Sequence, residues 1–580
     1  MSEQARASMT KVVATPESEP DRIGQPTAFS DRLKHFTLPS AMAAVLTALV
    51  FVLVLQFILI FLRSINWDEF HHYNLIYRLR AGTLGSPLQT FEARLFSWLP
   101  LTSSDVITQI QTARVAMFGC ELVTLTAIFG VARRFAGPMA SLFCVLAYIS
   151  GGEVFLRGFS YRPDAPAAAA LMTALWLLTT RRLTVVELVA TAALVGFAGI
   201  LTIKSVFYLP AFAGVALLRW GEAEDRRAFV ARMAALALLT ALSFLALLLA
   251  HRAGLPTGSL ARGQAIVGDS ASKMFSSGLL PKRWFLLEQI LMAPILSAVL
   301  AAAVFGTLRS KASRFERLAV AGLLLPPASV LVYTNSFPYF YAFILPPAAA
   351  AASIALERLR RGPFVCALSA AMLLNAALIF AVEPRDVLQT QRKIIAAVQE
   401  MFPTPVAYFS STQVIGDYPN PIPFMVSGWG LEDYKQQGRP QFLEAMERQR
   451  VPLLLIFSPY CALCSAVEDT PGVETLLPRD AAALHDNYVQ EWGPIWVAGK
   501  RIAAGTAPIT VTVLIPGDYT VEGPPLSIDG VSREAGGVVG LDRGAHVIGG
   551  PRSGPSVLRW GDHLTVPRGP PPEGAVFAEF

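Results

Sequence analysis

Residues 39–62 read PSAMAAVLTALVFVLVLQFILIFL and contain no charged side chain. About 20 apolar residues in a helix are enough to cross the hydrocarbon core of a bilayer, so this segment predicts a transmembrane helix. The composition of the whole chain agrees. The 580 residues are 53% hydrophobic and 16% charged, with a mean hydropathy of +0.47, whereas a soluble domain carries about 25% charged residues. These values exclude a secreted, cytosolic or disordered protein.

Ten further apolar segments follow the first, and short polar connections separate them. They lie near residues 107–132, 138–153, 165–180, 185–203, 205–218, 233–250, 285–307, 318–334, 340–356 and 363–382. Their apolar character indicates helices that cross the membrane. The predicted fold class is therefore a polytopic α-helical membrane protein with about eleven transmembrane helices.

Clusters of arginine and lysine mark every second connection. They are Arg133 with Arg134, Arg181 with Arg182, Arg226 with Arg227, Arg309 with Lys311 and Arg314, and Arg358 with Arg360 and Arg361. Positively charged loops stay in the cytoplasm, so residues 1–38 are predicted to form a disordered cytoplasmic tail. An odd number of spans then places the C-terminus outside the bacterial cytoplasmic (inner) membrane. The two spans beside Lys204 are short and nearly fused, and the loss of one would place the C-terminus inside.

The composition changes after residue 383, where the predicted transmembrane domain (39–383) ends. Residues 384–504 contain an amphipathic stretch at 387–401, the strand VAYFSS, a helix near 440–449 and the buried strand PLLLIF (452–457). This order predicts an extracytoplasmic α/β region. Residues 505–580 contain short strands separated by Gly and Pro, which predict an extracytoplasmic β-rich region, a small β-sandwich.

The first outer loop carries the residues best suited to chemistry. Residues 66–73 read NWDEFHHY, and the apolar residues that follow recur at helical spacing, which predicts a helix along the membrane surface. Asp68 at this membrane exit can act as a general base toward an acceptor hydroxyl, and Glu69 can tune its pKa or orient it. His71 and His72 are candidate substrate-binding residues beside them.

Two alternatives are open for this loop. Asp68 can instead be the N-cap of the surface helix, where its carboxylate would accept backbone hydrogen bonds. His71 and His72 follow Asp68 by three and four residues, a spacing that could also hold a metal ion.

A second segment, FLRGFSYRPD at residues 155–164, lies in a later outer loop. Arg157, Arg162 and Lys204 are cations on the side where the topology rule disfavours positive charge. Such cations suggest a bound anion, with a lipid phosphate of the outer leaflet as the obvious candidate. The alternative is that they extend to lipid headgroups. Asp164 is followed by Ala-Pro and can cap the next helix, or it can hold Arg162.

Three other features allow two interpretations each. Cys461 and Cys464 form a C-x-x-C pair, which predicts a local disulfide in an oxidising compartment more than thioredoxin-like chemistry. Residues 251–284 could be a lid or an ordinary loop. The aromatic residues of 333–341 suit sugar stacking or an interfacial belt. Glu121, inside the second span, is expected to face the bundle.

Taken together, these features resemble the GT-C fold glycosyltransferases, and among them the family 39 type. That type includes the dolichyl-phosphate-mannose protein mannosyltransferases and the aminoarabinose transferases of lipid A. The specific parts of the resemblance are the loop of Asp68 and Glu69 and the stretch Tyr161-Arg162-Pro163-Asp164, and the similarity covers roughly residues 40–380. The continuation Phe70-His71-His72 is not a requirement of that family, and the C-terminal region carries no acceptor signature.

The resemblance implies a reaction and a set of roles. A sugar would pass from a polyprenyl-phosphate donor to an acceptor hydroxyl of a glycan, lipid or protein, with inversion and with Asp68 as the base. Arg157, Arg162 and Lys204 would stabilise the departing lipid phosphate, which needs no metal. The implied partners are thus the lipid-linked donor and the membrane, with no further cofactor and no nucleic acid.

Two other classes of membrane protein predict different sequence features. A transporter or lipid flippase would carry out no chemistry, and it predicts internal repeats and broken polar spans at the midplane, which the sequence does not clearly show. A structural membrane scaffold would leave the loop of Asp68 unexplained.

Overall fold

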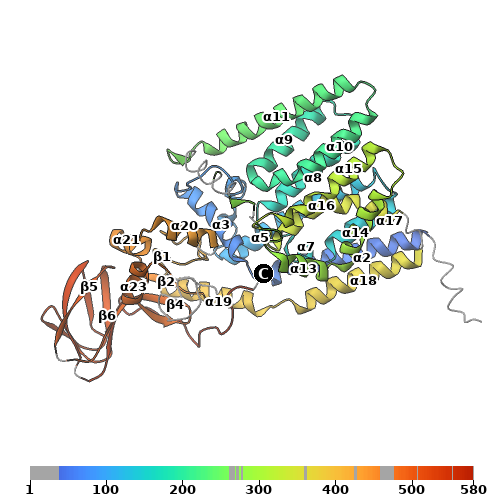
Figure 1. Ribbon diagram of the computed structural model, residues 1–580. Coiled ribbons are helices and arrows are strands. Elements are labelled where there is room, and N and C mark those ends of the chain that lie inside the picture. Colours follow the sequence, from blue (N-terminus) through green and yellow to red (C-terminus); the bar gives the residue numbers. More distant parts are fainter. Residues whose placement is uncertain are drawn as a thin grey trace, which may run out of the picture.

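The computed structural model describes residues 38–578, apart from 260–267, 269–272, 276–277, 358–361, 423–427, 458–475, 506 and 552. A helical bundle forms one end of the molecule and a domain with two β-sheets forms the other, joined through helix α19 (Asp386–Met401) (Figure 1). The predicted cytoplasmic tail, up to residue 37, and the pair Cys461 and Cys464 lie outside the described residues.

Every apolar segment predicted from the sequence contains helix, which confirms a polytopic helical architecture. In lipid, a helix satisfies each backbone N–H within its own segment, and this favours helix for all of these runs. The helices are α2 (Leu38–Leu62), α5 (Val106–Ala132), α6 (Pro138–Ile149), α8 (Asp164–Thr180), α9 (Val185–Leu201), α10 (Leu209–Glu222), α11 (Arg226–Arg252), α13 (Arg283–Met292), α14 (Pro294–Leu308), α15 (Arg314–Leu324), α16 (Tyr339–Ala351) and α18 (Gly362–Val382).

Not every predicted span is one long helix. Within the described residues, five stretches are long and apolar enough to cross a membrane alone: Ala41–Leu62, Val106–Ala132, Ile203–Glu222, Arg226–Arg252 and Gly362–Met401. The span predicted at 285–307 consists of α13 and α14, which meet at 102°, and it gives a sixth if counted as one. Pro294 begins α14, where the missing N–H of proline ends the preceding hydrogen-bond ladder. Other predicted spans are shorter helices, such as α6, α9 and α16.

The bundle is held together by close helix contacts. Helices α2 and α18 run side by side (Figure 1), and α10 packs along α15. A Cβ atom on Gly322 of α15 would lie 2.4 Å from the carbonyl oxygen of Pro210, and one on Gly214 of α10 would lie 2.8 Å from that of Leu318. Glycine at both positions lets the two backbones approach, as is common between helices in membranes.

Two short elements lie outside the spans, at the end of the bundle that faces the sheet domain. They are α3 (Trp67–Arg80), the surface helix predicted from the sequence, and α4 (Phe91–Leu95). Polar contacts join α3 to the C-terminal domain. The side chain of Gln391 in α19 donates to the carbonyl of Ile65 (2.7 Å), and Asn74 of α3 donates to the carbonyl of Gln413 (3.1 Å). One apolar cluster also contains residues of both parts, so the C-terminal domain fixes the position of α3.

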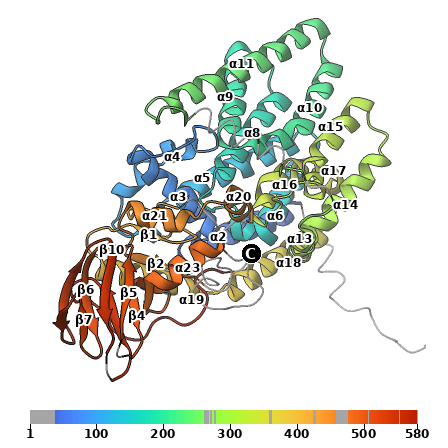
Figure 2. The same cartoon turned by 60° about the vertical axis from the view of Figure 1, so that its left-hand side comes forward.

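The C-terminal domain mixes helices with two sheets (Figure 2). Its helices are α19, α20 (Gly428–Gln437), α21 (Gln441–Arg448) and α23 (Pro478–Asn487). Its strands are β1 (Tyr408–Phe409), β2 (Leu453–Leu455), β3 (Tyr488–Trp492), β4 (Ile495–Ile502), β5 (Pro508–Val513), β6 (Gly517–Glu522), β7 (Leu526–Ile528), β8 (Val531–Arg533), β9 (Val538–Leu541), β10 (Gly544–Gly549) and β11 (Ser556–Trp560).

The larger of the two sheets crosses the predicted boundary between residues 504 and 505. A seven-stranded sheet has the order β1-β2-β4-β11-β6-β9, with β3 also paired to β4, and a four-stranded sheet has the order β5-β10-β7-β8. Strand β4 pairs antiparallel with β11, from Ile502 opposite Ser556 to Gly499 opposite Arg559. Both sheets contribute to one apolar cluster, which agrees with a sandwich. The regions 384–504 and 505–580 therefore share a sheet and form one structural unit.

Candidate active site

The first turn of α3 presents Asp68. Asn66 is the N-cap: its side chain accepts from the backbone N–H of Asp68 (3.0 Å), and the Glu69 carboxylate accepts from the N–H of Asn66 (3.1 Å). This reciprocal capping box uses Asn66 and Glu69. The prediction that Asp68 itself caps the helix is therefore wrong. Its carboxylate is left for other contacts, and 20% of the side chain is exposed.

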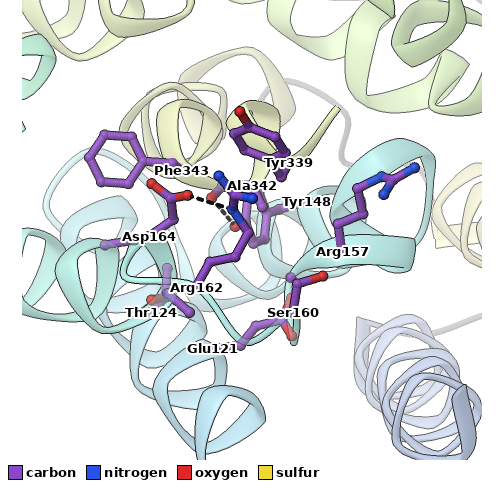
Figure 3. A pocket seen from close by; sticks show the side chains of 13 residues that line it. Glu121, Thr124, Tyr148, Arg157, Ser160, Arg162, Asp164, Tyr339, Ala342 and Phe343 are labelled. Carbon is purple, nitrogen blue, oxygen red and sulfur yellow. Dashed lines mark hydrogen bonds and ion pairs between the residues drawn. The ribbon is translucent and has the colours of Figure 1, made fainter. Parts of the chain in front are cut away.

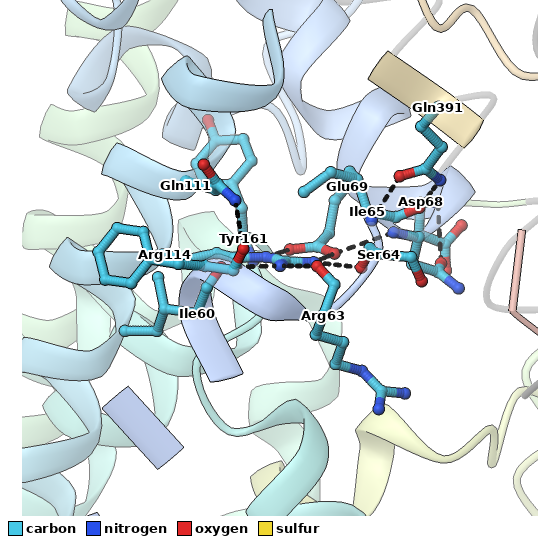
Figure 4. A network of polar contacts seen from close by, with 12 residues as sticks. Ile60, Arg63, Ser64, Ile65, Asp68, Glu69, Gln111, Arg114, Tyr161 and Gln391 are labelled. Atoms are coloured by element: carbon cyan, nitrogen blue, oxygen red, sulfur yellow. Dashed lines mark hydrogen bonds and ion pairs between the residues drawn. The ribbon is translucent and has the colours of Figure 1, made fainter. Parts of the chain in front are cut away.

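Glu69 is locked into a buried network (Figure 4). Arg114 of α5 donates Nε to Glu69 Oε1 (2.8 Å) and Nη2 to Glu69 Oε2 (2.6 Å), and both side chains are 1% exposed. The backbone N–H of Tyr161 also donates to Glu69 (2.8 Å). Burial alone would raise the pKa of Glu69, but the charge and hydrogen bonds of Arg114 hold it below its ordinary value. Glu69 thus ties α3 to α5 and to the loop before α8.

Arg114 completes the same network at the end of α2. Its guanidinium donates to the carbonyl oxygens of Ile60 (3.2 Å), Arg63 (2.9 Å) and Ser64 (2.7 Å). Together with the two bonds to Glu69, these use all five N–H donors of the guanidinium. Because all of its donors are used, the Arg114 guanidinium fixes the chain between α2 and α3. It thereby fixes the direction in which α3, with Asp68 in its first turn, extends from α2.

Arg162 lies against Asp68. Its Nη1 is 2.5 Å from Asp68 Oδ2, and its Nε is 3.2 Å from Asp164 Oδ2. Lys204, in the 3-10 turn Ile203–Tyr208, forms an ion pair with Asp164 Oδ1. The guanidinium carbon of Arg162 also lies 3.4 Å from the ring centroid of Tyr339, which begins α16. Arg162 and Lys204, two of the three predicted cations, thus form one continuous chain of ion pairs with Asp68 and Asp164.

Asp164 does not cap α8. It is the first residue of that helix after the N-cap Pro163, and its side chain makes no capping hydrogen bond. Its carboxylate instead binds Arg162 and Lys204. The capping interpretation is therefore wrong, and the other prediction, that Asp164 holds Arg162, is confirmed.

Arg157 lies in the same part of the bundle. It ends α7 (Gly152–Arg157), and its Nε is 2.7 Å from Glu153 Oε2. Arg157, Arg162, Asp164 and Tyr339 line one cavity of about 20 Å³ (Figure 3). The sequence placed Arg157 with Arg162, and the structure brings both to this cavity.

Glu121 lines the same cavity from α5. It faces the bundle as predicted, and Gln56 of α2 donates to its Oε1 (3.2 Å). Glycine at position 158 leaves room for this carboxylate, because a Cβ atom there would lie 1.9 Å from Glu121 Oε1.

His71 and His72 follow Asp68 on α3, and both are partly buried, with 15% of the His72 side chain exposed. Burial lowers the pKa of His71 to about 4 despite the nearby charge of Asp68. Burial also lowers the pKa of His72 well below its ordinary value, and the charge of Arg162 adds to this effect. Both imidazoles are therefore neutral at pH 7, and they can act as hydrogen-bond partners beside Asp68 without carrying charge.

Glu92 is a residue of this site that the sequence did not single out. It is 1% exposed in α4, and His72 Nδ1 lies 2.9 Å from its Oε1. Burial raises the pKa of Glu92 to about 8, so the carboxyl group holds a proton at neutral pH. The only local sign was an acidic residue in the segment FEARLF, where a solvent-exposed helix face explains it equally well.

The alternative of a metal site at His71 and His72 finds no support in the described part of the chain. Among those residues, no group of three or more His, Cys, Asp or Glu side chains could hold a metal ion. His72 contacts Glu92 rather than completing a set of ligands with Asp68.

Comparisons with known proteins bear on the fold. No protein-family model matches the sequence, and no curated protein matches it. Among solved structures, the chain resembles ArnT from Cupriavidus metallidurans bound to undecaprenyl phosphate, at 12% identity and a TM-score of 0.52, over 71% of this chain and 93% of that one. A second similar structure is the apo oligosaccharyltransferase of Archaeoglobus fulgidus, at 10% identity and a TM-score of 0.49, over 85% of this chain and 74% of that one.

The likeness to ArnT extends over most of both chains, so it concerns the whole architecture rather than one helical hairpin. It confirms the fold predicted from the sequence. The chain is a multi-pass membrane protein with the GT-C fold and a C-terminal domain containing two sheets.

Proposed function

We propose that the protein is a glycosyltransferase that takes a sugar from a polyprenyl-phosphate donor and transfers it to an acceptor hydroxyl at the outer face of the bacterial inner membrane. The observation that carries the proposal is the contact between Asp68 and Arg162. A partly exposed carboxylate lies directly beside a buried guanidinium at the end of the bundle. Transfer from a lipid phosphate requires a proton acceptor and a cation for the phosphate, and a carboxylate beside a guanidinium suits both roles.

In the proposed reaction, Asp68 acts as the general base. The acceptor oxygen attacks the anomeric carbon and forms the new C–O bond, while the bond from that carbon to the phosphate oxygen breaks. The hydroxyl proton passes to Asp68, and the electron pair of the broken bond leaves with the lipid phosphate. Attack on the face opposite the leaving group inverts the anomeric configuration. A positioned base of this kind contributes about 10²- to 10⁴-fold to a rate.

Arg162 and Lys204 stabilise the departing phosphate in this proposal. Each is held by Asp164, and Arg162 also lies on the ring of Tyr339, so both cations are fixed before the donor arrives. Fixed donors need no reorganisation as charge develops on the leaving oxygen. Arg157 lines the same cavity and provides a third positive charge.

His71 and His72 are proposed to bind the substrates beside Asp68. Because burial keeps both neutral, neither competes with Arg162 for the phosphate charge. Glu92 fixes the ring of His72 through the contact at Nδ1, which leaves Nε2 as the atom able to meet a sugar hydroxyl.

The fold supports this proposal. ArnT, which shares the fold, was solved with undecaprenyl phosphate, a lipid of the proposed donor class. A transporter of such lipids would bind the same phosphate but would leave the bond between sugar and phosphate intact.

The decisive experiment uses purified protein in lipid nanodiscs and a panel of radiolabelled polyprenyl-phosphate sugars, with envelope extract as the acceptor source. Transfer of label to a water-soluble or protein-bound product supports the proposal. A flippase assay in liposomes tests the alternative: movement of intact donor between leaflets, with no release of the lipid phosphate, would overturn it.

A further inference from the structure

The C-terminal domain contains a groove far in sequence from the proposed active site. Helix α23, strand β4 and strand β5, labelled in Figure 2, contribute residues to its lining. The groove has a volume of about 640 Å³, which is typical of ligand sites. Its polar lining includes Arg479 and Asp486 from α23, Lys500 and Arg501 from β4, and Thr510 and Thr512 from β5. Strand β5 is an edge strand of the four-stranded sheet, so neighbouring strands do not close this side.

The lining of the groove carries more positive than negative charge. Within the described part of the chain, Arg479, Lys500 and Arg501 form no salt bridge and no hydrogen bond through their side chains. Arg501 lies with its guanidinium carbon 5.8 Å from the ring centroid of Trp496. Asp486 is the one acid among the described lining residues, and its carboxylate contacts His485 (3.2 Å).

Lys500 is the most informative of the three cations. It is half-buried on β4, and burial lowers its pKa to about 8, which the more distant Asp486 partly offsets. Half-burying an amine without a partner carboxylate is unfavourable. Elsewhere in this protein, the buried cations Arg114, Arg162 and Lys204 all have carboxylate partners. Lys500 forms no such ion pair among the described residues, so its ammonium group can meet an anionic ligand directly.

We propose that this groove binds an anionic oligosaccharide, with Lys500, Arg479 and Arg501 contacting its carboxylate or phosphate groups. Thr510 and Thr512 of β5 also line the groove, and their hydroxyls are neutral hydrogen-bonding groups of the kind that sugar hydroxyls use. That the oligosaccharide is the acceptor rests on the proposed function. The anion-binding groove itself does not depend on it, because the groove lies wholly within the C-terminal domain.

The test measures binding directly, with no donor present. Full-length protein in phosphatidylcholine nanodiscs is titrated with tetragalacturonate, which carries four carboxylates, and with maltotetraose, a neutral saccharide of the same length. We expect tetragalacturonate to bind at least about tenfold more tightly, because each charge-assisted hydrogen bond contributes about one order of magnitude or more in affinity. Equal binding of the two saccharides, or no binding of either, would overturn the proposal.

Matched variants locate the site. Lys500→Gln and the double variant Lys500→Gln with Arg479→Gln should weaken tetragalacturonate binding about tenfold or more. Lys500→Arg should retain most of the affinity, and Lys435→Gln, at an exposed lysine of α20, should leave it unchanged. Unaltered thermal denaturation midpoints show that the variants fold. Tetragalacturonate binding that is insensitive to Lys500 and Arg479 would contradict the assignment.

The two proposals can fail separately. If the donor panel yields no transfer but Lys500→Gln weakens tetragalacturonate binding, the results support the anion-binding groove and contradict the proposed reaction. If transfer occurs and tetragalacturonate does not bind, the results contradict the anion-binding groove and support the proposed reaction.

Discussion

The guanidinium of Arg162 lies with Nη1 2.5 Å from Asp68 Oδ2, although the two residues are 94 positions apart in the chain. Asp68 belongs to the first turn of α3, whereas Arg162 precedes α8. In the absence of substrate, each group therefore neutralises the other. A donor phosphate that binds Arg162 would compete with Asp68 for it, and this would leave the carboxylate available to accept a proton.

The first prediction concerns the phosphate. Arg162→Gln and Lys204→Gln should each weaken binding of bare polyprenyl phosphate about ten- to a hundredfold, because a buried charge-assisted contact contributes about 1.5 to 3 kcal/mol. Arg162→Lys should lose less than Arg162→Gln, since it keeps the charge. Titration of the lipid phosphate into purified protein measures all three.

Arg252→Gln provides the matched control, because Arg252 is an exposed cation at the end of α11. Its lipid phosphate affinity should equal that of the wild type. If Arg162→Gln and Lys204→Gln also bind the lipid phosphate normally, these residues do not hold the leaving group.

A second prediction separates support from chemistry at Glu69. Glu69→Gln leaves Arg114 buried without its carboxylate, and breaking one partner of such a pair costs about 3–5 kcal/mol of folding free energy. The thermal denaturation midpoint in detergent should therefore fall clearly. Glu400→Gln, at an exposed position of α19, should change it little. A Glu69→Gln protein as stable as the wild type would show that the network of Arg114 does not support the fold.

Glu92 leads to a prediction about pH. Its pKa of about 8 in the folded protein lies above its unfolded value, so the folded state binds an extra proton between about pH 4.5 and 8. The stability linked to this proton is complete below pH 4.5 and is lost as the pH rises toward 8. Glu92→Gln should remove this loss. The denaturation midpoint of the variant should therefore rise relative to that of the wild type as the pH increases from 5 to 8. A constant difference across that range would show that Glu92 is already ionised at pH 5.

Much of the fold could be predicted because hydrophobicity is a strong local signal. The run at 39–62 is α2, and the stretch at 387–401 is α19. The break at Pro294 is less predictable, because an apolar run with proline can kink within a span or turn sharply between two helices. The pairing of β4 with β11 could not be predicted from the sequence, because strand order depends on contacts between residues far apart in the chain.

In the candidate active site, too, some features could be predicted from the sequence and others could not. Asp68, Arg162 and Lys204 could be predicted as site residues from their type, because charged side chains beside a predicted span are costly and are usually kept for a function. The ion pair between Asp68 and Arg162 could not be predicted, since Asp68 and Asp164 each had a local role as a possible helix cap. Glu92 was missed because burial, which gives it an altered pKa, is a property of the folded chain and has no local pattern.

The central claim is that Asp68 accepts the proton of the acceptor hydroxyl, and single-turnover transfer by Asp68→Asn tests it most directly. Asparagine keeps the size of the side chain but cannot act as the base, so the rate of sugar transfer should fall at least about a hundredfold. Asp386→Asn, at an exposed acid in the first turn of α19, should transfer at the wild-type rate. Binding of polyprenyl phosphate and the denaturation midpoint report whether the Asp68→Asn protein is intact. Transfer by intact Asp68→Asn protein at the wild-type rate would contradict the account.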